Sequence, residues 1–343
     1  MKFNELLQRP MFALALLALG MAIIPLNDAI IKLLSSELPL AEIVTVRAMM
    51  SIVLVGIFSN GIARMFALSA KAFWLFVGRG MCLVIAMALF FIPLGSLPLP
   101  TVVSIFFVSP LLITLFSVPF LGEKIGVHRI ASVIAGMLGV LLIIRPGSAD
   151  FQPETLLVIG SAISYALFQI WTRRLKAVGD LNAMVAVQHV CYFGAAFPVL
   201  LLNWLWPVAE TGNVSIDFLL REPVALGLVE IGMLVVCAFA VLFLSFASSN
   251  AYRVVEASLI APFEYTAIPL GVFWGIVIWG DWPEPTAWVG MMLILGGGLY
   301  AVYRERARDT LVITSTPMPV SAAMAQVDPE DQFDTDPEGN NRV

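Results

Sequence analysis

Long runs of hydrophobic residues make up most of the chain, and short polar segments separate them. A membrane-spanning helix needs about 20 predominantly apolar residues, since each residue adds about 1.5 Å along the helix axis. Runs of that length predict an all-α polytopic membrane protein with about ten transmembrane helices. The predicted helices lie near residues 12–34, 41–60, 72–94, 100–121, 127–145, 154–176, 181–205, 223–248, 255–279 and 286–303.

Two of the predicted helices share an unusual layout. The ninth carries Glu264 near its middle, between Pro262 and Pro269, and the fourth carries Pro110 and Pro119. Prolines remove backbone donors, so the freed carbonyls need other partners. An ionised group at that depth costs about 2.5 to 3.5 kcal/mol on insertion scales, so Glu264 is expected to face protein or water. Paired, proline-interrupted membrane segments in the two halves of a chain indicate a transporter's substrate site.

The two halves can be aligned as an internal repeat. The matches are Asp28, Lys32 and Arg47 with Gln169, Arg173 and Gln188 (141 residues apart), Ser104 and Pro110 with Ser258 and Glu264 (154 apart), and Gly122, Glu123 and Gly139 with Gly280, Asp281 and Gly297 (158 apart). Each half holds five predicted helices, and an odd number forces the halves to insert with opposite orientation. The predicted domains are a first repeat at 1–146, a second at 147–304 and a tail at 305–343.

Composition supports the membrane assignment and separates the tail from it. The chain is 60% hydrophobic and 13% charged, and its net charge is -5. After residue 308, seven acidic residues stand against one arginine. The tail is therefore expected to be disordered, and no basic surface for nucleic acid remains. The three cysteines all lie inside apolar runs, so neither a disulfide framework nor a metal site is predicted.

The placement of lysine and arginine predicts the orientation. Thirteen basic residues fall on the side of the two termini and two on the opposite side. Because basic residues accumulate in cytoplasmic connections, both termini are expected to be cytoplasmic.

The chain resembles, over roughly residues 12–304, the EamA-type members of the drug/metabolite transporter superfamily. The resemblance rests on the runs PLPTVVSIFFVSPLLITLFSVPFLGEKIGVHRIASVIAGMLGVLLIIRPG and PFEYTAIPLGVFWGIVIWGDWPEPTAWVGMMLILGGGLY. Gly280-Asp281 stands where the family usually shows Gly-Glu. The resemblance implies a cavity lined by helices 1, 3, 4, 6, 8 and 9, with helices 5 and 10 outside it. It also implies a carrier of small metabolites in a bacterial cytoplasmic (inner) membrane.

Three polar residues are expected at similar depth on helices around that cavity: Glu264, Arg79 and Gln169. Counting from the helix ends places them roughly 10 to 14 Å from the cytoplasmic face. One hypothesis is that Glu264 pairs with Arg79 in one state, while substrate or a proton competes for the carboxylate in another. The alternative is a permanent structural ion pair.

Aromatic residues form a second group of candidates. Tyr165 and Gln169 share a helix face, and Tyr265 follows Glu264. With Trp274, these rings are candidates for stacking on a planar or amphipathic substrate, or for ordinary packing. Five other tryptophans are expected in the outer aromatic belt of the membrane: Trp204, Trp206, Trp279, Trp282 and Trp288.

A third group is expected in the outer half of the membrane. Asp28 and Arg47 lie at similar depth on the first two helices, so they can meet, and under the repeat they correspond to Gln169 and Gln188. These pairs occupy positions where the gates of an alternating carrier would lie. Polar glue between helices is the other interpretation.

The predicted function is a secondary active transporter of a small metabolite, amino-acid-like or aromatic and vitamin-like, coupled to protons or working by exchange. Uptake of a larger aromatic nutrient, such as riboflavin or S-adenosylmethionine, and an uncoupled uniporter or channel are the alternatives. The expected partners are a small-molecule substrate, the lipid bilayer and protons; a homodimer is left open. An intramembrane enzyme is not favoured, because no HExxH, GxSxG or phosphate-binding loop occurs. No cofactor is predicted.

Overall fold

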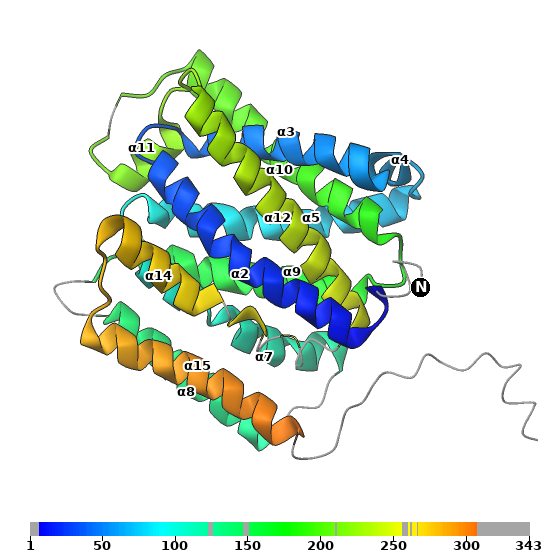
Figure 1. The fold of residues 1–343 in the computed structure, drawn as a ribbon, viewed down its shortest axis with the longest axis vertical. Helices are drawn as coiled ribbons and strands as arrows, with labels where there is room; N and C mark the ends of the chain where they lie inside the picture. Colours follow the sequence, from blue (N-terminus) through cyan, green and yellow to red (C-terminus); the bar gives the residue numbers. More distant parts are fainter. Residues whose placement is uncertain are drawn as a thin grey trace, which may run out of the picture.

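A computed structural model of the chain describes residues 7–122, 126–146, 151–209, 211–255, 260, 263–265 and 267–306, which form helices joined by short connections without any strand (Figure 1). By length and composition, seven helical segments within these ranges are able to cross a membrane, and three shorter apolar stretches accompany them. The predicted all-α polytopic membrane fold is confirmed. From residue 307 on, the predicted tail lies outside the described residues, as do Glu123, Ser258 and Pro262.

Most helices follow the predicted hydrophobic runs closely, but the eighth, predicted at 223–248, spans Leu228–Val254, and in the ninth, predicted at 255–279, helix α14 begins only at Ala267. Their bounds are α2 (Pro10–Leu34), α3 (Leu40–Ser59), α4 (Gly61–Phe66), α5 (Ala70–Leu94), α6 (Leu99–Phe106), α7 (Ser109–Leu121), α8 (Val127–Ile144), α9 (Thr155–Arg174), α10 (Leu181–Leu205), α11 (Val214–Leu220), α12 (Leu228–Val254), α14 (Ala267–Trp279) and α15 (Pro285–Arg306). The short helices α4 and α11 lie in segments predicted as connections. The side chain of Asn213 caps α11 by accepting from two backbone N–H groups, and α11 buries Phe218 completely.

The fourth predicted helix is broken into α6 and α7, with Phe107 and Val108 between them. Pro110 lies in the first turn of α7, where its missing N–H costs no helical hydrogen bond. The hydroxyl of Thr114 donates to the Pro110 carbonyl at 3.1 Å, a bond to the residue four positions earlier that threonine often makes inside a helix. In the ninth segment, α14 begins at Ala267 and carries Pro269 in its first turn in the same way.

Two glycines end the corresponding helices of the two halves. Gly122 follows α7 with a φ of 71°, and Gly280 follows α14 with a φ of 68°. Both angles lie in the left-handed region, which glycine adopts without the steric cost that other residues bear. The 158-residue spacing of these two glycines therefore marks the same helix ending used twice.

The helix contacts also correspond when the two sets of five predicted spans are exchanged. The contact of α2 with α12 has its counterpart in that of α9 with α5, and α5 with α10 corresponds to α12 with α3. Likewise, α7 packs on α9 as α14 packs on α2. Helices α8 and α15 pack side by side along one flank (Figure 1). They approach closely at Gly139 and Gly290, where a Cβ on Gly139 would lie 2.5 Å from the Gly290 carbonyl oxygen.

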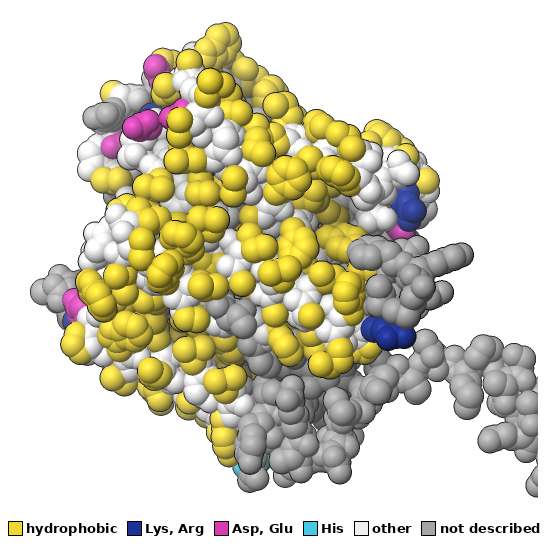
Figure 2. Space-filling model, in the orientation of Figure 1, with side chains coloured by type: hydrophobic (Ala, Val, Ile, Leu, Met, Phe, Trp, Pro, Cys, Tyr) yellow, Lys and Arg dark blue, Asp and Glu magenta, His cyan; other side chains and the backbone are white. Residues whose placement is uncertain are grey.

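Hydrophobic side chains predominate among the described residues drawn in Figure 2, and charged side chains lie at the left and right margins. An apolar face bounded by charge suits a bundle surrounded by lipid. Four of the five predicted belt tryptophans are exposed: Trp204, Trp206, Trp282 and Trp288. Trp279, at the end of α14, is partly buried against the core and lies under the ammonium of Lys32, 5.2 Å away.

Candidate functional site

A cavity of about 100 Å³ lies inside the bundle. Its walls come from α2, α3, α5, α6, α9, α10, α12 and α14, with Phe107 and Glu264 from the breaks in the fourth and ninth segments. None of its described lining residues belongs to α8 or α15. The arrangement differs from the expected one in a single respect, because the second and seventh spans contribute Arg47, Gln188 and Tyr192.

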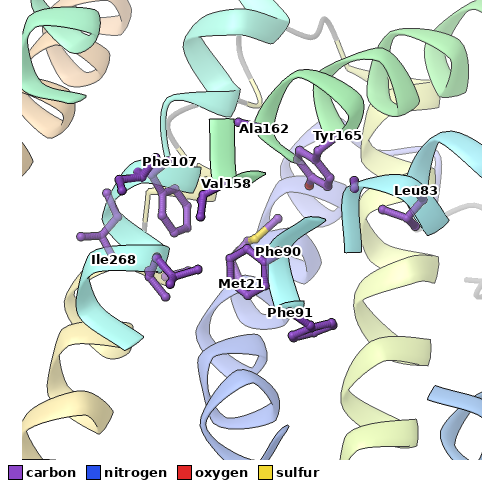
Figure 3. Close-up of a cluster of buried hydrophobic side chains, with 14 of the residues drawn as sticks. Met21, Leu83, Phe90, Phe91, Phe107, Val158, Ala162, Tyr165 and Ile268 are labelled. Carbon is purple, nitrogen blue, oxygen red and sulfur yellow. The ribbon is translucent and has the colours of Figure 1, made fainter. Parts of the chain in front are cut away.

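Aromatic rings form much of the cavity wall. Phe106 lies at the centre of this group, with ring centroids 5.1 Å from Phe90 and 5.2 Å from Tyr165. Figure 3 shows Met21, Phe90 and Tyr165 approaching the same central space from α2, α5 and α9. Rings in such positions offer flat apolar faces to a planar group.

Glu264 supplies a carboxylate to this cavity and is 1% exposed. Its Oε1 accepts hydrogen bonds from the hydroxyls of Tyr252 at 2.9 Å and Tyr165 at 3.1 Å. The amide of Gln169 donates to the same Tyr165 hydroxyl at 2.6 Å and to Ser248 at 2.9 Å. The Gln169 Oε1 has no hydrogen-bond partner. The carboxylate is thus held by neutral donors, in a network that joins α9, α12 and the ninth segment.

Arg79 does not pair with Glu264 in this structure, which argues against the alternative of a permanent ion pair. Its guanidinium is fully buried and donates to Thr172 at 2.7 Å, Gln188 at 3.2 Å and Ser249 at 2.7 Å. It also lies over the ring of Phe168, 4.1 Å from the centroid. Arg79 is absent from the described cavity lining, because these neutral acceptors hold it between α5, α9, α10 and α12.

Asp28, Arg47 and Gln188, predicted as gate residues, line the cavity itself. Asn27 connects the first two, since Arg47 donates to its Oδ1 at 3.4 Å and its amide donates to Asp28 at 2.9 Å. No direct ion pair between Asp28 and Arg47 occurs in the described structure. Gln188 accepts from Arg79 and donates to Ser245, so Gln169 and Gln188 belong to two networks rather than one pair.

The predicted aromatic candidates divide between the cavity and the core. Tyr165 lines the cavity, whereas Tyr265 and Trp274 are not among its described lining residues. Tyr265 is buried beside Phe107, with its hydroxyl unpartnered, and Trp274 packs edge-on against Phe273.

Several residues of the cavity and of the Glu264 network were missed at the level of sequence. Tyr192 lies one helical turn after Gln188, so the same face argument that selected Tyr165 would have found it. Asn27 is adjacent to a charged candidate, Asp28. Tyr252 carried no comparable signal, because it reaches Glu264 across the connection between α12 and the ninth segment.

Comparison with known proteins finds similarity to transporters. Residues 11–145 match the EamA-like transporter family. An S-adenosylmethionine uptake transporter of Rickettsia prowazekii is 23% identical over 240 residues, 70% of this chain and 75% of that protein. A riboflavin transporter of Vibrio cholerae is 26% identical over 193 residues, 56% of this chain and 59% of that protein. The pseudopaline exporter CntI of Pseudomonas aeruginosa is 24% identical over 269 residues, 78% and 88% of the two chains.

A protein of known crystal structure superposes with a TM-score of 0.61 at 18% identity, covering 88% of this chain and 99% of that one. This similarity concerns the fold alone. The family match and the relatives confirm the predicted relationship to the drug/metabolite transporter superfamily. The relatives named above are transporters and not enzymes.

Proposed function

We propose, from the premise that residues 11–145 are an EamA-like transporter domain with transporters as relatives, that this multi-pass membrane protein is a secondary carrier of a small metabolite. The central cavity is the substrate site, and the two five-helix halves open it alternately to either side. The matched helix contacts and the matched helix endings of the two halves support this mechanism.

The observation that carries the proposal is the buried carboxylate of Glu264 in an aromatic cavity, bonded by two tyrosine hydroxyls. Glu264 faces protein and a cavity, as an ionisable group within the membrane should. A carboxylate held by neutral donors remains available to a cationic group of the substrate or to a proton. The aromatic walls suit the flat, apolar part of the same substrate.

Uptake of a larger aromatic nutrient is the second candidate. Its support is the ring-lined wall together with the names of two relatives, an S-adenosylmethionine uptake transporter and a riboflavin transporter. A third relative is named an exporter, so the direction of transport is tested separately. We further propose cytoplasmic termini in a bacterial inner membrane, from the placement of basic residues.

The test uses the purified protein in proteoliposomes. Labelled amino acids, riboflavin and S-adenosylmethionine are assayed for exchange and for flux, with and without a proton gradient. A carrier exchanges labelled for unlabelled substrate across the membrane, whereas a channel only equilibrates it.

Glu264→Gln then tests the site. Glutamine keeps the size of the side chain and an oxygen that accepts from Tyr165 and Tyr252, so a purely structural role would survive. We expect loss of transport at normal membrane abundance, while Glu222→Gln, in an exposed connection, stays active. Full activity of Glu264→Gln with an unchanged response to the proton gradient refutes the assignment of the carboxylate.

A further inference from the structure

Two basic side chains make the same kind of contact at different places in the fold. Lys32, near the end of α2, donates from Nζ to the backbone carbonyl of Leu97 at 2.6 Å, in the connection between α5 and α6. Arg173, near the end of α9, donates to the backbone carbonyl of Val255, directly after α12. Each contact ties the end of one span to the connection that precedes a broken one.

The two contacts occupy corresponding places in the internal repeat. Lys32 and Arg173 are 141 residues apart, the spacing that also relates Asp28 to Gln169. Their acceptors lie in corresponding connections, since Leu97 follows the third span and Val255 follows the eighth. The donors therefore recur in register, and each reaches the connection after the equivalent span.

The contacts lie beyond opposite ends of the cavity. Lys32 is one helical turn past Asp28, which lines the cavity, and Arg173 is one turn past Gln169, which bonds the lining residue Tyr165. Five predicted spans separate Lys32 from Arg173. An odd number of crossings puts them on opposite faces of the membrane.

Lys32 has a second attachment, to the end of α14. Its Nζ is 3.8 Å from Asp281 Oδ2, in a pair whose side chains are 13% and 29% exposed, and it lies 5.2 Å from the Trp279 ring centroid. The first, fourth and ninth segments thus meet at one cation. Glu123, the sequence counterpart of Asp281, lies outside the described residues. The described contact of Arg173 is the one with the Val255 carbonyl.

We infer that Lys32 and Arg173 are a matched pair of latches, each closing one end of the transport cavity. Both are engaged here, and the cavity between them has a volume of only about 100 Å³. Opening to one face breaks one latch while the other holds. This inference rests on the proposed carrier function and assigns its two gates to single side chains.

The test measures access to the cavity and needs no substrate. In the full chain, Cys82, Cys191 and Cys237 are replaced by alanine, and Val241→Cys, in the cavity wall, supplies one reporter thiol. A membrane-impermeant maleimide is added to right-side-out and to inside-out vesicles. We expect Lys32→Met to raise the labelling rate about tenfold from one face and Arg173→Met to raise it about tenfold from the other. A roughly tenfold change is the size expected when one charge-assisted hydrogen bond is lost.

Matched controls keep the charge or remove a neighbouring one. Lys32→Arg retains a cationic donor and should label like the parent. Arg174→Met removes an exposed arginine next to Arg173 and should change nothing. Should Lys32→Met fail to reach the membrane, Asp281→Asn keeps the Leu97 bond and is expected to give a smaller rise from the same face. A rise from the same face in both methionine variants, or from neither face, overturns the inference.

The outcomes separate this inference from the proposed function. If labelling rises from opposite faces in Lys32→Met and Arg173→Met but no tested metabolite is transported, the latches are supported and the substrate assignment is refuted. Active transport with unchanged labelling in Lys32→Met and Arg173→Met refutes the latches and leaves the carrier intact.

Discussion

Replacing Arg79 by methionine should destabilise the protein without changing its affinity for substrate. Arg79 is 0% exposed and donates three hydrogen bonds, at 2.7, 3.2 and 2.7 Å, to groups on three different helices. Methionine fills similar space along the stem and offers no donor. The acceptors on Thr172, Gln188 and Ser249 would then lose their shared partner.

The size of the effect follows from these contacts. Interhelical hydrogen bonds in membrane proteins average about 0.6 kcal/mol, and bonds to charged groups contribute about 1.5 to 3 kcal/mol. Three such bonds and the stacking on Phe168 amount to roughly 3 to 6 kcal/mol. Removing the buried cation offsets part of this lost free energy, because the folded protein no longer bears the cost of desolvating the charge. A net loss of about 2 to 3 kcal/mol corresponds to a fall in Tm of about 3 to 4 °C, since the unfolding entropy of a chain of this length is about 0.7 kcal/mol/K.

Thermal unfolding in detergent, followed by size-exclusion chromatography, measures the change. Lys71→Met, which removes an exposed cation from the same helix, is the matched control and should leave Tm unchanged. Arg79→Lys should fall between the two, since lysine is a point charge that cannot span three acceptors. An unchanged Tm in Arg79→Met together with a large rise in KM would show that Arg79 acts on the substrate and would refute this reasoning.

Two further predictions concern the Glu264 carboxylate and the packing of α8 against α15. Tyr252→Phe removes one hydrogen-bond donor from Glu264 and should change KM about three- to tenfold while the protein stays folded. Tyr165→Phe also removes the contact with Gln169 and alters the cavity wall, so it should change KM by a larger factor. Equal KM values in wild type and both variants would contradict this role. Gly139→Ala should lower Tm, because its Cβ meets a backbone oxygen at 2.5 Å, whereas Gly194→Ala, which meets nothing within 4 Å, should not; transport per folded molecule should stay the same in both.

Local chemistry explains which parts of the fold were predictable. The apolar runs predicted the ends of eight of the ten helices to within three residues, because each must match the bilayer thickness, whereas the eighth and ninth differ by more. The break before Pro110 and the helix ends at Gly122 and Gly280 also follow from single residues whose backbone requirements are strong. Helix α11 was missed because its apolar run is short and its main signal is one capping side chain, Asn213.

The polar network of the site was less predictable, because its partners are neutral. The sequence placed Glu264 and Arg79 at a similar depth in the membrane, and their opposite charges suggested that they pair. The structure instead gives Glu264 two tyrosines and gives Arg79 a threonine, a glutamine and a serine. Serine and threonine are common in membrane helices, so nothing in the sequence marked Thr172 or Ser249 as acceptors. Which rotation of each helix faces the cavity is a tertiary property.

Separate neutral partners for the acid and the base also suit a carrier that must change shape. Breaking a buried ion pair by withdrawing one partner costs about 3 to 5 kcal/mol, which would burden every cycle if Glu264 and Arg79 held each other. Arg79 is satisfied without Glu264, so the carboxylate can exchange a tyrosine hydroxyl for a substrate group or a proton and leave no uncompensated cation behind. The exchange then costs about one hydrogen bond to a charged group, roughly 1.5 to 3 kcal/mol, which binding of a cation can offset. Under the proposed function, the fold keeps its permanent charge contacts in Arg79 and leaves Glu264 for the transport cycle.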